Sequence, residues 1–316
     1  MKVRVLYHDH CFDGAASAAF FTRFLKKTRH PDAEYSYTGM AHTADQLFAD
    51  SMFDGDVNAI VDFKYSPNPK LSWWFDHHQS AFLRPEDAEL FHGSHNPLHF
   101  FDPAYRSCTK FIRDIAREKF GFEAPDLDEL VKWADIIDGA QYATAKDAVE
   151  LKAAATRLVL VIEAVKGSEL VPSIIRSMQT MTLDEIASQP EITAAFAPLY
   201  QRHLRSIDLI QAHSVTERGV IFFDLIGQEL EGYNKFVPYY LFPDATYTVS
   251  VSESSFRTKV SVGSSPWANE VNHNLASICE RYGGGGHPRV GAISFPVGAI
   301  DQARSAAAEI VSELRG

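Results

Sequence analysis

Three short apolar runs near the amino terminus each lead into side chains that are common metal ligands. The runs are residues 3–7, 59–61 and 71–75, and the side chains that follow them are His8, Asp13, Asp62, Asp76, His77 and His78. A carboxylate and two imidazoles at the end of a buried strand are costly to place there without a metal. Clustered Asp and His side chains suit hard divalent cations. The pattern therefore predicts a site for one or two such ions.

Each of these segments taken alone has a simpler explanation. Asp is a favoured N-cap at the start of a helix, and a His pair after a strand is often part of a turn. All three segments, however, follow strand-like runs, and the carboxyl edge of an open parallel sheet is where binding sites form. Together they favour the metal site over three separate caps.

The elements that must position these side chains predict an α/β fold with a parallel sheet. We expect strands at residues 2–7, 58–63 and 71–75, and helices at residues 14–27, 44–50, 106–120, 126–137 and 145–165. Alternating strands and helices are typical of a parallel sheet with crossover helices. Most of residues 171–213 is also expected to be helical, as a linker, a hinge or a dimer surface, so the sequence allows a homodimer.

A second, smaller α/β region follows this helical segment. We expect strands at residues 220–223, 247–252 and 259–262, and helices at residues 272–282 and 300–314. The predicted organisation is a metal-binding domain at residues 1–188, a helical linker at residues 189–214 and a second domain at residues 215–316.

The composition limits where the protein works and what it binds. The chain has 316 residues, three widely spaced cysteines and a net charge of −11. It contains no apolar stretch of the roughly 18 residues that a membrane helix needs, and it begins with strand-like sequence instead of a signal peptide. We therefore expect a cytoplasmic protein without a disulfide framework or a membrane partner. The negative charge argues against long duplex nucleic acid and allows a small anionic substrate or a short oligonucleotide.

A glycine-rich loop near the carboxyl terminus is a candidate anion site. Backbone without side chains allows close approach of a ligand and lets several amides point at one phosphate, whereas a helix C-cap would need only one glycine. Nearby His and Arg side chains could add donors and positive charge. The predicted substrate-binding residues are Gly284, Gly285, Gly286, His287 and Arg289.

Taken together, these segments resemble the DHH phosphoesterase superfamily. The similarity consists of strand-HDHCFDG, strand-VD, strand-FDHH and the GGGGH loop of the DHH-associated cap domain, in that order from His8 to His287. The resemblance implies a catalytic domain that binds two divalent ions, usually Mn²⁺ with Mg²⁺ or Co²⁺ as alternatives, and a cap domain that contacts the substrate. Members hydrolyse phosphate esters or anhydrides, from short oligonucleotides and nucleotides to polyphosphate.

The resemblance also implies a role for each candidate residue. The residues that match metal ligands are His8, Asp13, Asp62 and His77, with Asp62 expected to bridge both ions. The expected catalytic residues are Asp76, which would orient or assist, and His78, which would lie near the substrate phosphate or the metal. The fourth motif is an aspartate at a helix end, and both Asp135 and Asp138 are candidates for it.

Two positions depart from the family pattern. Cys11 stands where the first motif usually has an aspartate, so the metal there would rely on His8 with help from Asp9 or His10, bind more weakly, or be a different ion. In the cap, Gly263 stands where an arginine is usual, and Arg257 or Arg289 could substitute for it.

The sequence favours a metal-dependent phosphoesterase that hydrolyses phosphodiester or phosphomonoester bonds of short oligonucleotides or small nucleotides with a metal-activated water. A polyphosphate or pyrophosphate hydrolase is the alternative that the missing cap arginine supports. A non-catalytic nucleotide sensor on the same scaffold is a third interpretation, to which Cys11 lends weight. The sequence leaves the exact substrate and the cleavage polarity open.

Overall fold

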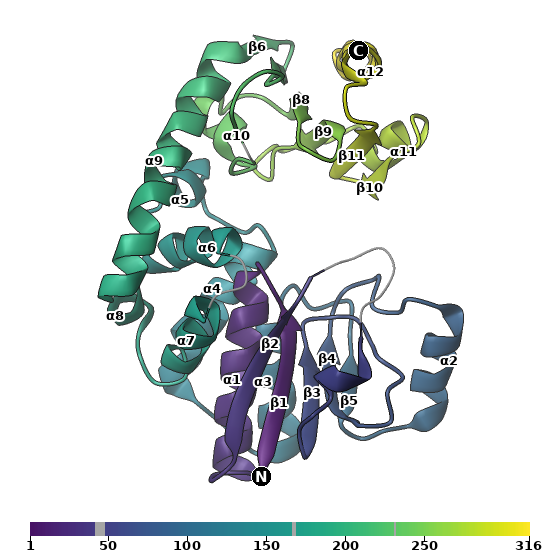
Figure 1. The fold of residues 1–316 in the computed structure, drawn as a ribbon. Coiled ribbons are helices and arrows are strands. Elements are labelled where there is room, and N and C mark those ends of the chain that lie inside the picture. The colour runs from purple at the N-terminus through teal and green to yellow at the C-terminus, as the bar shows by residue number, and fades with distance from the viewer. Residues whose placement is uncertain (42–47, 166–168, 231) are drawn as a thin grey trace. The chain divides into compact units, whose positions relative to one another are not determined.

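The computed structural model describes residues 1–41, 48–165, 169–230 and 232–316. The chain forms two compact units, each with its own sheet (Figure 1). The first unit consists of residues 1–141 and 152–199, and the second of residues 142–151 and 200–316. None of the helices in the described part of the chain is long and apolar enough to cross a membrane.

The first unit contains the predicted parallel sheet, which confirms the expected α/β class. Every neighbouring pair of its strands is parallel. In spatial order the strands are β2 (Glu34–Met40), β1 (Lys2–His8), β3 (Val57–Val61), β4 (Leu71–Asp76) and β5 (His99–Phe101). Because all five strands run the same way, their carboxyl ends lie at one edge of the sheet.

Helices cover one face of this sheet, and a smaller apolar cluster covers the other. Along β4 successive side chains point to opposite faces, so Trp73 packs against Phe24 on the helical side, with ring centroids 5.8 Å apart. Trp74 packs on the other side against Phe91, at 5.0 Å. The helices on the first face are α1 (Phe12–Thr28), α3 (Cys108–Phe120), α4 (Asp128–Asp138), α6 (Ala154–Ala164), α7 (Leu170–Ser177), α8 (Leu183–Ala187) and the start of α9 (Pro190–His213). Helix α2 (Pro85–Ser94) contributes Phe91 to the other face.

Some elements of the first unit differ from the sequence prediction. The strands β2 and β5 and the helix α2 were not expected, because β2 is half-exposed and polar and β5 has only three residues. The single helix predicted over residues 145–165 is wrong: the chain breaks between α5 (Ala145–Val149) and α6, where Leu151 has a φ of 51° that an α-helix does not contain. Residues 44–47 of the short predicted helix lie outside the described residues, and residues 50–52 form a 3₁₀ turn.

The second unit is built on a mixed six-stranded sheet. All neighbouring strands are antiparallel except the β7–β8 pair. The order is β10 (Gly285–His287), β11 (Val290–Phe295), β9 (Thr258–Ser264), β8 (Tyr247–Glu253), β7 (Val220–Asp224) and β6 (Ser214–Glu217), with helices α10 (Val237–Leu241), α11 (Leu275–Glu280) and α12 (Ile300–Leu314). The three strands predicted for this region are present, whereas β6, β10 and β11 were not expected.

The short segment 142–151 belongs to the second unit although its neighbours in sequence belong to the first. Its backbone carbonyls accept hydrogen bonds from side chains of that unit. The indole of Trp267 donates to the Tyr142 carbonyl at 2.9 Å, and the amide of Asn234 donates to the Ala148 carbonyl at 2.9 Å.

Candidate metal centre

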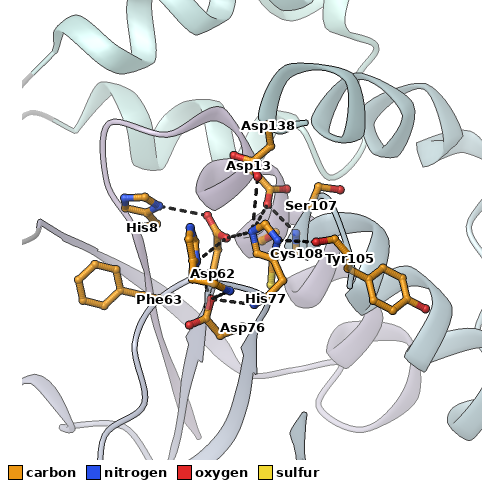
Figure 2. A network of polar contacts seen from close by, with 12 residues as sticks. His8, Asp13, Asp62, Phe63, Asp76, His77, Tyr105, Ser107, Cys108 and Asp138 are labelled. Carbon is orange, nitrogen blue, oxygen red and sulfur yellow. Dashed lines mark hydrogen bonds and ion pairs between the residues drawn. The ribbon is translucent and has the colours of Figure 1, made fainter. Parts of the chain in front are cut away.

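Five of the six predicted metal ligands come together at the carboxyl edge of the first unit's sheet (Figure 2). Each of them lies at or next to the end of a strand or helix, and their side chains point towards one another. The positions are His8 as the last residue of β1, Asp13 in the first turn of α1, Asp62 directly after β3, His77 directly after β4 and Asp138 as the last residue of α4.

His77 lies at the centre of the cluster. Its Nε2 is 3.2 Å from Asp62 Oδ1, 3.5 Å from Asp138 Oδ2 and 3.8 Å from Asp13 Oδ2. On the other side of Asp62, its Oδ2 lies 3.3 Å from His8 Nδ1. Ligand atoms from these elements thus fall into overlapping groups, each of which could hold an ion.

Asp62 is a buried acid of the cluster whose carboxylate lacks hydrogen bonds of normal geometry. It is 1% exposed, and neither of its carboxylate oxygens accepts a hydrogen bond of normal geometry. Its φ of 58° lies in the left-handed region, which Asp tolerates better than most residues. A buried carboxylate without hydrogen bonds is costly, and a divalent cation between the surrounding His and Asp side chains would remove that cost. The donor set therefore fits a metal ion.

The imidazole rings are oriented by groups outside the cluster. Nδ1 of His77 hydrogen-bonds to the Tyr105 carbonyl at 3.0 Å, which leaves Nε2 for the carboxylates. Nδ1 of His78 lies 2.7 Å from Asp76 Oδ1, and the same oxygen accepts the backbone amides of both histidines. Partners of this kind fix the tautomer of a metal-binding histidine, which agrees with the orienting role expected for Asp76.

Asp13 is held by the amino-terminal turn of α3. Its carboxylate accepts the Cys108 amide at 2.6 Å, the Thr109 amide at 3.1 Å and the Thr109 hydroxyl at 2.6 Å. The positive end of the helix dipole favours an acid at this place. Sequence reasoning missed these two residues, since two of the three donors are backbone amides, which leave no signal in the residue types.

The two candidates for the fourth motif are separated by the structure. Asp138 Oδ2 faces His77, and Asp138, Asp13 and His77 form one of the groups that could hold an ion. Asp135, one turn earlier, instead accepts Ser107 Oγ at 3.3 Å and lies 3.4 Å from the Lys110 ammonium. The geometry therefore supports Asp138 as the site residue.

The acids of the cluster compete for protons. Burial, together with Asp62 and Asp138, holds the pKa of Asp13 well above its usual range. Burial and Asp62 raise the pKa of Asp138 to about 6. Burial alone would lower the pKa of His77, but the close contact with the Asp62 carboxylate and the charges of Asp13, Asp62 and Asp138 raise it to about 10. Without a cation, the cluster therefore keeps protons at neutral pH.

Cys11 lies next to the cluster, although the sequence analysis did not count it among the metal ligands. Cys11, His8 and Asp62 each offer a ligand atom, and these atoms lie within 4.8 Å of one another. Burial and the neighbouring acids, Asp62 first, raise the pKa of the Cys11 thiol. The sequence signal was present, since this residue stood at a ligand position, but it was not assigned as a ligand.

The glycine-rich segment of the second unit is part of a hairpin. Gly284, whose amide donates to the Cys279 carbonyl at 2.9 Å, has no room for a side chain, since a Cβ would lie 2.3 Å from the Ala292 carbonyl oxygen. Gly286 has a φ of 155° and a similar clash with Val290, whereas Gly285 has open space. Packing thus accounts for two glycines, and the Gly284 amide is already used by the end of α11.

The two remaining predicted substrate residues flank the hairpin turn. His287 ends β10 and is exposed. Arg289 donates to the Ser265 carbonyl at 2.6 Å, and its own carbonyl accepts the Ser264 amide. Arg257, the other candidate to replace a cap arginine, donates to Ser294 at 3.0 Å. Both arginines keep donors beyond these single contacts.

The fold of the chain is also found among solved structures of other proteins. No protein-family model matches the chain, and no curated protein matches it in sequence. Among solved structures it is similar to the pGpG-specific phosphodiesterase PggH from Vibrio cholerae, with a TM-score of 0.73, 18% identity, and coverage of 99% of this chain and 100% of PggH. RecJ from Thermus thermophilus, in complex with Mn²⁺, gives a TM-score of 0.58 and 14% identity over 99% of this chain and 52% of RecJ.

The proton balance of the cluster generates a test by calorimetry. Because His77 has a pKa of about 10 in the metal-free chain, a cation that binds its Nε2 at neutral pH must displace a proton. We expect Mn²⁺ affinity to rise about tenfold per pH unit for each displaced proton, and more steeply below pH 6, where Asp138 is protonated as well. Titration in two buffers of different ionisation enthalpy counts the protons. Binding without proton release at pH 7 would contradict the assignment.

The hairpin generates a matched pair of stability variants. Gly284→Ala places a Cβ against the Ala292 carbonyl and should lower the free energy of unfolding by about 1–3 kcal/mol, as overpacking does. Gly285→Ala meets nothing within 4 Å and should leave it nearly unchanged. Denaturant unfolding measures both. Equal effects of the two substitutions would show that packing does not explain the glycines.

Proposed function

We propose that this chain is a metal-dependent phosphoesterase that hydrolyses phosphodiester or phosphomonoester bonds of short oligonucleotides or small nucleotides. The observation that carries the proposal is the buried Asp62 carboxylate, which accepts no hydrogen bond of normal geometry and is surrounded by His8, His77 and His78. The DHH fold supports it as an independent argument. Clustered ligands of this kind serve metal-assisted hydrolysis.

Two Mn²⁺ ions are the proposed cofactor, with Mg²⁺ or Co²⁺ as alternatives. Asp62 belongs to two of the three candidate groups, with His8 on one side and His77 on the other, and Asp13 and Asp138 complete the third group around His77. This sharing supports Asp62 as a bridging ligand. Divalent cations bound there would supply a water of lowered pKa and offset the charge on the phosphoryl oxygens.

The other residues of the site orient and transfer protons. Asp76 holds the His78 ring by its Nδ1 and leaves Nε2 available to a substrate oxygen or a water. His78 is one-third exposed in its side chain, so solvent and substrate can reach it, unlike the buried His77. We assign His78 as the proton-transfer residue and Asp76 as the group that positions it.

The substrate contacts are proposed to come from the cap at residues 215–316, with residues 1–188 as the catalytic domain and residues 189–214 as the linker. The proposed anion-binding residues are Gly284, Gly285, Gly286, His287 and Arg289. The donors that Arg289 keeps beyond its contact with Ser265 support this role. The net charge of −11 argues for a short substrate over a long duplex, and PggH is named as specific for the dinucleotide pGpG. The free cysteines agree with a cytoplasmic location.

A polyphosphate or pyrophosphate hydrolase is the second candidate. Gly263 replaces the arginine expected in the cap, and a Cβ at this position would lie 3.3 Å from the Tyr239 hydroxyl. The strand β9 therefore has little room for an arginine side chain at this position. A substrate without a nucleoside would need fewer contacts there.

A substrate panel with Mn²⁺ tests the proposed function. The panel contains pGpG, a second linear dinucleotide, 3′-phosphoadenosine-5′-phosphate, a cyclic dinucleotide and short polyphosphate. Asp62→Asn keeps the left-handed backbone, which Asn also adopts, and removes the charge. We expect it to lower kcat/KM on the order of a thousandfold.

Two neighbouring residues of α4 provide the matched control. Asp138→Asn should reduce activity strongly, whereas Asp135→Asn, three residues away and paired with Ser107 and Lys110, should leave it close to the original value. Release of inorganic phosphate or shorter nucleotides, followed by chromatography, measures all variants. Full activity in Asp62→Asn would reject the role of Asp62 as a metal ligand. A bound nucleotide that stays intact with Mn²⁺ present would reject the hydrolase and favour the sensor.

A further inference from the structure

We propose that Cys11 is a thiolate ligand, with His8 and Asp62, of one metal position, and that this position therefore prefers a borderline cation such as Zn²⁺, Fe²⁺ or Co²⁺ to Mg²⁺. The inference rests on the proposed function only in requiring that the cluster binds metal. It adds a ligand and a metal class to that cluster, and it makes the two ends of the cluster chemically unequal.

The backbone between β1 and α1 brings Cys11 back towards His8. His10 has a φ of 55°, in the left-handed region, and reverses the chain within the loop. The first turn of α1 then lies directly against the end of β1, since a Cβ at Gly14 would be 2.1 Å from the His8 carbonyl oxygen. This tight return places the Cys11 sulfur with ligand atoms of His8 and Asp62 inside a 4.8 Å group.

Asp62 gives independent support for an ion at this place. The residue is only 1% exposed, and both carboxylate oxygens are buried without a hydrogen bond of normal geometry. Oδ2 is the oxygen on the side of His8, at 3.3 Å from Nδ1. One oxygen is therefore available to the group with Cys11, while Oδ1 faces His77 at 3.2 Å.

The other cysteines have structural environments that Cys11 lacks. Cys108 is fully buried and its Sγ donates to the Phe75 carbonyl at 3.5 Å. Cys279 is fully buried in the second unit, where its Sγ would lie 2.5 Å from a Cβ at Gly291. Cys11 is partly exposed and faces the acids of the cluster. Packing explains the first two thiols and not the third.

The donor sets of the groups differ in softness. The group of Asp13, His77 and Asp138 contains only nitrogen and oxygen ligands, which suit Mn²⁺ and Mg²⁺. The group of His8, Cys11 and Asp62 adds sulfur, which moves its preference towards softer ions. On binding, the Cys11 thiol loses its proton to solvent and its sulfur donates a lone pair to the cation. We therefore expect unlike ions in the two positions when both kinds are supplied.

Cobalt titration of the full chain tests this ligand by a readout other than activity. A Co²⁺–thiolate bond gives a charge-transfer absorption in the near ultraviolet that oxygen and nitrogen ligands do not give. We expect the band in the original chain and in Cys279→Ala, whose thiol lies outside the cluster, and its loss in Cys11→Ser and Cys11→Asp. A phosphine reductant keeps the thiols reduced without competing for the metal.

Metal competition provides the second readout. Cys11→Asp restores a hard ligand and should lower the Zn²⁺/Mn²⁺ affinity ratio at least about tenfold, while the total bound metal stays the same. A stoichiometric cobalt complex without the band, or an unchanged affinity ratio in Cys11→Asp, would overturn the thiolate ligand and leave the proposed hydrolase intact. The band together with a silent substrate panel would keep the ligand and reject the hydrolase.

Discussion

The constraint on which the site depends is the electrostatic repulsion between neighbouring carboxylates that are wholly or largely buried. Asp13 and Asp62 are almost fully buried, Asp138 lies beside them, and His77 is the cation that sits among all three. At low dielectric, charges of the same sign a few ångströms apart are strongly unfavourable. The raised pKa of Asp13 and of Asp138 is the response of the metal-free chain. A divalent ion would supply the positive charge that one imidazolium does not.

The scaffold keeps these side chains together against that repulsion. Backbone amides at the start of α3 hold Asp13, the Tyr105 carbonyl holds His77, and Asp76 holds His78. These contacts come from a helix and loops that follow the parallel strands, so the core beneath the sheet edge fixes the ligand geometry. Ligands that are already oriented lose little entropy when an ion binds.

The sequence predicted the parallel sheet and the residues at its edge because both leave periodic or chemical signals. Trp73 and Trp74 mark a strand that is buried on both faces, and Asp62 and His77 follow such strands directly. It did not predict β2, since a half-exposed strand with polar residues has no apolar run. The sequence could not show which of Asp135 and Asp138 faces the cluster. That depends on how α4 is rotated against α3, where Lys110 forms an ion pair with Asp135. The sequence also did not reveal why Gly284 and Gly286 must lack side chains, because both pack against the strand β11, which was not predicted.

The position of residues 142–151 has a consequence for how the chain is assembled. The polypeptide passes from one unit to the other at residues 141/142, 151/152 and 199/200, so no single cut in the backbone yields two complete units. During synthesis this segment emerges well before Asn234 and Trp267, whose side chains donate hydrogen bonds to its carbonyls. The second unit therefore completes its packing only after the ribosome has delivered both portions, and a chain that stops at residue 199 carries an orphan piece of a unit it lacks.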